Sequence, residues 1–80
     1  MEIRYSKQAV KSINAMDVVT KQRIKAAIEN LPAGDIKLLK GKCVSTYRLR
    51  VGAWRVLFSY GDNIIEIEKI APRGQAYKGV

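Results

Sequence analysis

Histidine is absent from this sequence of 80 residues, and cysteine occurs only once, at Cys43. Without histidine the chain cannot form a Ser-His or Cys-His catalytic pair, and a zinc site has few ligands to draw on. A single cysteine cannot form a disulfide within the chain. We also find no signal-like start and no apolar run near the roughly 18 residues of a membrane span. These absences predict a cytoplasmic protein that does not engage a membrane.

Basic residues, in contrast, are abundant. Lysine and arginine number 15 against 7 acidic residues, which gives a net charge of +8. Residues 1–35 carry 6 basic and 4 acidic groups, whereas residues 36–80 carry 9 and 3. The second half would therefore attract a polyanion such as nucleic acid. The alternative is a basic surface that has no target.

Residues 1–80 are expected to form one small domain. Residues 1–5 alternate as a short strand, after which Ser6 can cap a first helix. Asp17 can cap a second helix, which Pro32 and Gly34 end. Each helix has an apolar stripe at helical spacing; the stripes comprise Ala9, Ile13 and Met16 in the first helix, and Ile24, Ala27, Ile28 and Leu31 in the second.

Three segments with alternating side chains follow: 44–51, 54–60 and 64–70. A further short extended piece is expected at 36–39. The expected order of elements is one strand, then two helices, then several antiparallel strands. This order indicates an α+β domain. We expect a short N-terminal strand, a helical hairpin, and a three- to four-stranded antiparallel sheet whose helices cover one face.

The first two strands are expected to form a hairpin with Gly52 and Ala53 as its turn. Because side chains alternate along a strand, this turn fixes which residues share a face. One face is then apolar, and it comprises Tyr47, Leu49, Val51, Trp54, Val56 and Phe58. The other face carries Arg50 opposite Arg55, and Arg48 opposite Leu57. We expect the arginine face to point outward, away from the helices.

Two like charges opposite each other are unfavourable in a sheet, so this arrangement calls for a reason. Clustered guanidinium groups match the oxygens of a phosphate. The alternative is a polar face that its own neighbours neutralise. A turn at Gly61 and Asp62 would place Glu68 opposite Arg55 and Glu66 opposite Leu57. In the C-terminal segment, Arg73 and Tyr77 combine a guanidinium with an aromatic ring, as RNA-stacking sites do. Taken by itself, Tyr77 is better explained as a packing residue that closes the edge of the sheet.

The whole pattern resembles the RelE family of bacterial toxins, within the RelE/ParE superfamily. The resemblance covers nearly all of the chain and rests on four stretches: YSKQAVKSI, LPAGDIKLLKG, YRLRVGAWRVLF and IEKIAPRGQAYK. It implies the toxin of a type II toxin–antitoxin system, which is a small sheet with two N-terminal helices. Such a toxin is a ribosome-dependent endoribonuclease that cuts mRNA in the ribosomal A site, and a cognate antitoxin blocks it.

The resemblance also implies which residues act. The family's catalytic positions match Arg48, Arg50, Arg55, Arg73 and Tyr77, and no histidine stands near Arg73 as it does in some relatives. We further expect Lys40, Lys42 and Lys78 to contact RNA. In the implied complex with operator DNA, the antitoxin supplies the DNA contact.

The implied reaction is attack of a ribose 2′-OH on the adjacent phosphate, which needs no metal and no cofactor. The arginines would stabilise the charged phosphorane. Arginine is a poor base, because its pKa lies above ~12. We therefore expect Tyr77 to orient or deprotonate the 2′-OH, with Glu68 as the rival base.

Two other functions stay open at this point. A ParE-like protein would share the fold but would inhibit DNA gyrase through protein contacts, for which the arginine and tyrosine set is not needed. A non-catalytic RNA-binding module would use the same basic face without cleaving the strand.

Overall fold

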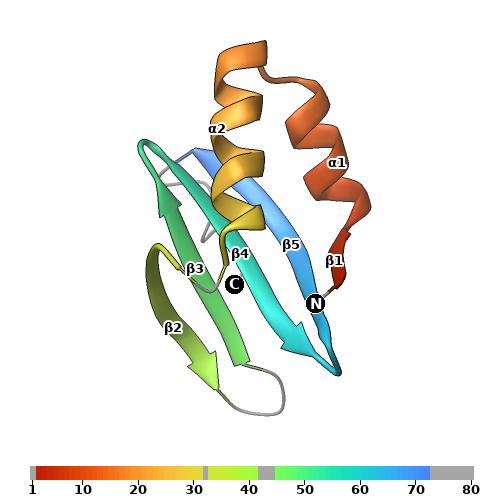
Figure 1. The fold of residues 1–80 in the computed structure, drawn as a ribbon, viewed down its shortest axis with the longest axis vertical. Helices are drawn as coiled ribbons and strands as arrows, with labels where there is room; N and C mark the ends of the chain where they lie inside the picture. Colours follow the sequence, from red (N-terminus) through yellow and green to blue (C-terminus); the bar gives the residue numbers. More distant parts are fainter. Residues whose placement is uncertain (1, 32, 42–44, 73–80) are drawn as a thin grey trace.

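The computed structural model describes residues 2–31, 33–41 and 45–72, and it forms two layers (Figure 1). Five strands build one sheet, and two helices lie over one of its faces. In chain order the elements are β1 (Glu2–Tyr5), α1 (Lys7–Asn14), α2 (Val18–Glu29), β2 (Asp35–Gly41), β3 (Ser45–Val51), β4 (Trp54–Gly61) and β5 (Ile64–Pro72). The expected α+β class, with its helices on one face, is confirmed.

The strand order across the sheet is β1-β5-β4-β3-β2. Strands β2 to β5 pair antiparallel, which confirms the expected antiparallel sheet. The expected extended piece at 36–39 is the longer edge strand β2. Strand β1 adds a fifth strand, because it pairs parallel with β5, with Glu2 beside Ile64 and Tyr5 beside Ile67. Strand β4 is the central strand of the sheet.

Both helices begin where the sequence predicts. The Ser6 side chain caps α1 by accepting a hydrogen bond from Ala9 N, and the Asp17 side chain caps α2 by accepting one from Thr20 N. The hydrogen bonds from Thr20 also lower the pKa of the exposed Asp17 carboxyl. Such caps satisfy N–H groups that have no partner inside the helix. In the described part of the chain, neither helix has the length and apolar character needed to cross a membrane.

The core lies between the helices and the sheet. The predicted stripes supply Ala9, Ile13, Ile24 and Ile28, each of which is at least nine-tenths buried. They pack with Leu49, Val56 and Phe58 of the central hairpin and with Ile65, Ile67 and Ile70 of β5. This burial of apolar surface, at about 25 cal/mol per Å², is the main term that stabilises the fold.

Glycine is required where α2 connects to β2. Gly34 has a φ of +125°, a backbone conformation that residues with a side chain rarely adopt. A Cβ atom built at Gly34 would also lie 2.8 Å from Leu49 Cδ1, which is too close. The connection therefore runs directly against the core, and it sets β2 beside β3.

Candidate phosphate-binding site

The central hairpin has the register that the sequence predicts. Gly52 and Ala53 form the turn, and Gly52 has a φ of +59°. Arg50 pairs with Arg55, and Arg48 pairs with Leu57. The apolar partners Leu49, Val56 and Phe58 face the helices. Because side chains alternate along the strands, Arg48, Arg50 and Arg55 lie together on the face away from the helices, which we call the arginine face.

The arginine face is not as open as the sequence suggested. Arg55 is only 5% exposed, and its neighbours on the same face of β4, Leu57 and Ser59, are 2% and 3% exposed. Residues 55 to 59 are thus all buried, so the central strand is covered on both faces. The expectation that all three arginines point into solvent is wrong for Arg55. Leu57, an apolar residue at a position of the polar face, was the sequence signal for this burial.

Arg55 is held by the hairpin turn. Its Nη1 donates to the carbonyl oxygens of Gly52, at 3.2 Å, and of Trp54, at 3.1 Å. A buried charge needs hydrogen-bond partners of this kind to offset its lost hydration. Both bonds come from one nitrogen, so the guanidinium, which carries five N–H groups, retains others for a ligand.

Arg48 is fixed from the edge of the sheet. Its Nη2 donates to Asp35 Oδ1 of β2 at 3.1 Å, and the Arg48 side chain is 14% exposed. Its Nε is buried and has no hydrogen-bond partner. An unpaired buried donor costs roughly 1–3 kcal/mol, so an acceptor atom from a ligand would be favoured there. The sequence pattern gives Asp35 no partner, because it precedes the extended piece expected at 36–39. The pairing of β2 with β3 brings it to Arg48.

Arg50 is the exposed member of the group. It lies on β3 directly opposite Arg55, and no ion pair joins it to any described residue. Only the carboxylate of Asp35 neutralises an arginine of the hairpin within the described residues. The arginine face thus carries three guanidinium groups and the one carboxylate that pairs with Arg48. Guanidinium groups can bind two oxygens of a phosphate at once, so this face has the chemistry to hold a phosphodiester.

The predicted compensation by Glu68 does not occur. The β4–β5 turn lies at Asp62 and Asn63, one residue later than expected, and a bulge at Leu57 and Phe58 shifts the register again. Arg55 therefore pairs with Ala71, and Leu57 pairs with Lys69. Glu68 instead accepts a 2.7 Å hydrogen bond from Ser59 Oγ through its Oε2. Glu66 pairs with Ser59 rather than with Leu57.

Several predicted site residues lie outside the described part of the chain. These are Lys42, Arg73, Tyr77 and Lys78, and their positions relative to the arginine face stay predictions. Lys40 is described by its backbone only, at the end of β2 beside a bulge after Leu38. Among the described residues, no group of three or more acidic, histidine or cysteine side chains could hold a metal ion.

Of the comparisons with known proteins, the one with solved structures identifies the fold. No protein-family model and no curated protein matches the sequence. A chain of the archaeal RelE-RelB complex from Pyrococcus horikoshii OT3 superimposes with a TM-score of 0.75 and 29% identity, over 94% of this chain and 97% of the other. A chain of the RelB-RelE antitoxin-toxin complex from Methanococcus jannaschii gives a TM-score of 0.73 and 28% identity, over 94% and 95%. The fold of this chain is therefore RelE-like.

Proposed function

We propose that this chain is the toxin of a type II toxin–antitoxin system and that it cuts mRNA in the ribosomal A site. The observation that carries the proposal is the cross-strand pair Arg50 and Arg55 beside Arg48. Placing like charges opposite each other costs stability in a sheet. A phosphate that binds between the guanidinium groups would remove that cost and would account for the arrangement.

The three arginines are suited to different parts of one task. Arg50 is exposed, so it can contact the RNA strand before the two more buried arginines do. Arg48 and Arg55 are held in place by Asp35 and by the turn carbonyls, so they need little reorganisation when charge develops. Donors fixed in advance around a developing oxyanion are the most effective kind of electrostatic catalyst.

In the proposed reaction the ribose 2′-OH loses its proton and attacks the adjacent phosphorus atom. The bond from phosphorus to the 5′ oxygen breaks, which leaves a 2′,3′-cyclic phosphate and a free 5′-OH. The arginine face, together with Arg73, would stabilise the phosphorane. Tyr77 would orient or deprotonate the 2′-OH, while Arg48 or Arg50 could protonate the leaving oxygen.

The second part of the proposal is a protein partner. The two solved structures that this chain resembles are complexes of RelE with RelB. The fold leaves large apolar side chains exposed; they are Val10, Val18, Val19, Leu38 and Tyr60. An antitoxin would cover part of this surface, and the resulting complex would reach operator DNA through the antitoxin.

The decisive experiment is primer extension on an mRNA in a translating extract. Wild type, Arg50→Ala and Tyr77→Phe would be compared, with Lys11→Ala as the matched control because Lys11 is an exposed basic residue of α1. We expect wild type and Lys11→Ala to give new 5′ ends at fixed codon positions. Arg50→Ala is expected to lose at least about tenfold in rate, because it removes a charged hydrogen bond worth roughly 1.5–3 kcal/mol.

The same assay separates the other functions. Because alignment by the ribosome would supply much of the catalysis, purified protein should be nearly inert on free RNA. Efficient cleavage of naked mRNA would contradict the proposed dependence on the ribosome. A footprint without new 5′ ends would indicate a non-catalytic RNA-binding module. Growth inhibition that persists in Arg50→Ala without any cleavage would favour a gyrase inhibitor.

A further inference from the structure

A small cavity lies at the tip of the central hairpin, on the helix side of the sheet. Its lining comes from the first turns of α2 and from the hairpin turn, and its volume is about 150 Å³; the lining residues are Thr20, Arg23, Ile24, Val51, Ala53 and Trp54. A cavity of that volume accommodates one benzene-sized ring. The candidate phosphate-binding site does not include any of these residues.

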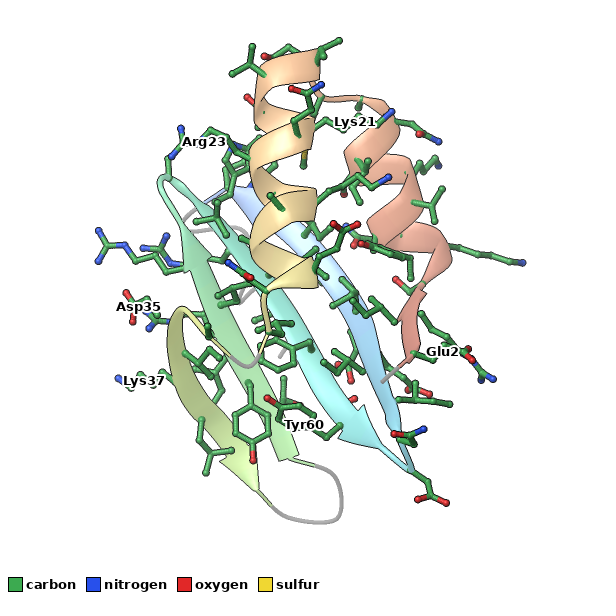
Figure 2. The ribbon with its side chains drawn as sticks, in the orientation of Figure 1. Glu2, Lys21, Arg23, Asp35, Lys37 and Tyr60 are labelled. Atoms are coloured by element: carbon green, nitrogen blue, oxygen red, sulfur yellow. The ribbon has the colours of Figure 1, made fainter. Side chains whose placement is uncertain are left out.

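Arg23 gives this cavity its charge. Figure 2 shows the exposed Arg23 side chain projecting from α2 beside the hairpin turn, and a Cβ atom built at Gly52 would lie 3.4 Å from Arg23 Nη2. The guanidinium is therefore placed directly over the turn. Among the described lining residues Arg23 carries the only charge, and the nearby Asp17 carboxylate accepts a hydrogen bond from the Thr20 hydroxyl.

The other polar and aromatic groups narrow the class of ligand. The Thr20 hydroxyl already donates to Asp17 Oδ1 at 2.6 Å, so it can only accept a hydrogen bond from a ligand, whereas Arg23 can only donate. Trp54 is partly buried, packs against the core and also lines the cavity, so it supplies an indole surface. A planar ring with both donors and acceptors on its edge satisfies all three groups, and a nucleobase is such a ring.

The cavity and the arginine face belong to the same hairpin tip. Val51 and Trp54 form the last pair before the turn, and Arg50 and Arg55 form the next pair, facing the opposite side. Arg55 also donates to the carbonyl oxygens of Gly52 and Trp54, so it holds the wall of the cavity in place. An RNA strand that passes around the tip could place a phosphate on one side and a base on the other.

We propose that this cavity, between α2 and the hairpin turn, binds one unpaired nucleobase of the RNA strand held by the arginine face. Trp54 stacks on the base, while Arg23 and Thr20 hydrogen-bond to its edge. The inference rests on the proposed function only in that the arginine face holds RNA. It adds a recognition site at which one base of the strand is read.

Trp54 is the only tryptophan in the chain, so tryptophan fluorescence reports on the surroundings of this one residue. The purified protein would be titrated with a short 2′-O-methyl oligoribonucleotide, which lacks the attacking hydroxyl, and with an abasic oligomer carrying the same number of phosphates. We expect quenching by the first oligomer and none by the second. In competition against the first oligomer, the abasic oligomer should bind about tenfold more weakly, because stacking of one base contributes roughly 1–3 kcal/mol.

Two variants complete the test. Arg23→Gln should bind the base-containing oligomer about as weakly as the abasic one, whereas Lys11→Gln, which removes the same charge from the exposed face of α1, should bind like wild type. Equal quenching by both oligomers, an equal loss in the two variants, or no quenching up to millimolar oligomer would each overturn the proposal. Failure of mRNA cleavage would not produce these results, so the two proposals fail separately.

Discussion

The two faces of the sheet use burial for different purposes. On the helix side, Leu49, Val56 and Phe58 are at most 1% exposed and pack into the apolar core. On the arginine face, Arg55 and Ser59 are nearly as buried, but each is hydrogen-bonded, to turn carbonyls and to Glu68 respectively. The helix side stabilises the fold, whereas the arginine face keeps charged groups in fixed positions.

The difference shows how one strand can serve both purposes. Residues 55 to 59 of β4 are all buried, yet they alternate between apolar residues under the helices and a mixed set on the opposite face. Burying an apolar side chain contributes free energy directly. Burying a guanidinium is tolerated only where partners are already in place. Variants on the two faces should therefore fail in different ways.

The largest effect is expected on the helix side. Phe58→Ala removes a fully buried ring that stacks on Tyr47 at 5.6 Å and contacts Tyr60 edge-on at 5.5 Å. It should lower the free energy of unfolding by about 3–5 kcal/mol, as measured by urea denaturation. A loss below about 1 kcal/mol would mean that the core is not the main source of stability.

An intermediate effect is expected at the buried arginine. Arg55→Met keeps much of the side-chain stem but removes the hydrogen bonds to Gly52 and Trp54. Denaturation should show a loss of about 1.5–3 kcal/mol, since hydrogen bonds to charged groups contribute about that much. Should Arg55→Met prove as stable as wild type, the turn carbonyls do not offset the burial of the charge, and Arg55 is retained for function alone.

The smallest effect on stability is expected at Arg50. Because it is exposed and faces another arginine, Arg50→Ala should change the free energy of unfolding by less than about 0.5 kcal/mol, with a slight gain at low salt. The gain should shrink as salt screens the repulsion between the two guanidinium groups. A clear destabilisation would contradict the view that Arg50 is dispensable for folding. Together with the cleavage assay, the denaturation measurement on Arg50→Ala distinguishes a contribution of Arg50 to activity from a contribution to stability.

The helices and the central hairpin could be predicted from the sequence because their signals are local. Ser6 and Asp17 cap the helices within three residues of the N–H groups they bind. Gly52 adopts the positive φ that the tight turn requires, and this turn sets the register of Arg50 with Arg55. The register of the hairpin was therefore predicted correctly, whereas the role of its arginines stays a prediction.

The remaining features depend on contacts between distant residues. The turn between β4 and β5 was expected at Gly61 and Asp62, but it lies at Asp62 and Asn63, and Asn63 has a φ of 59°. The register shift between Leu57 and Phe58 has no clear signal in the sequence. Two such shifts moved Glu68 away from Arg55. The pairing of Asp35 with Arg48 and the burial of Arg55 depend on neighbouring strands, so no pattern within one segment could have revealed them.

The parallel pairing of β1 with β5 has a consequence for biosynthesis. Glu2 pairs with Ile64, so the sheet joins segments made at the beginning and near the end of the described chain. Such distant pairing slows folding, because closing the long loop between the two segments costs entropy before their contacts can form. The first strand has no partner until the translating ribosome has added residues 64–67. A nascent chain therefore cannot complete this sheet before residues 64–67 have been synthesised.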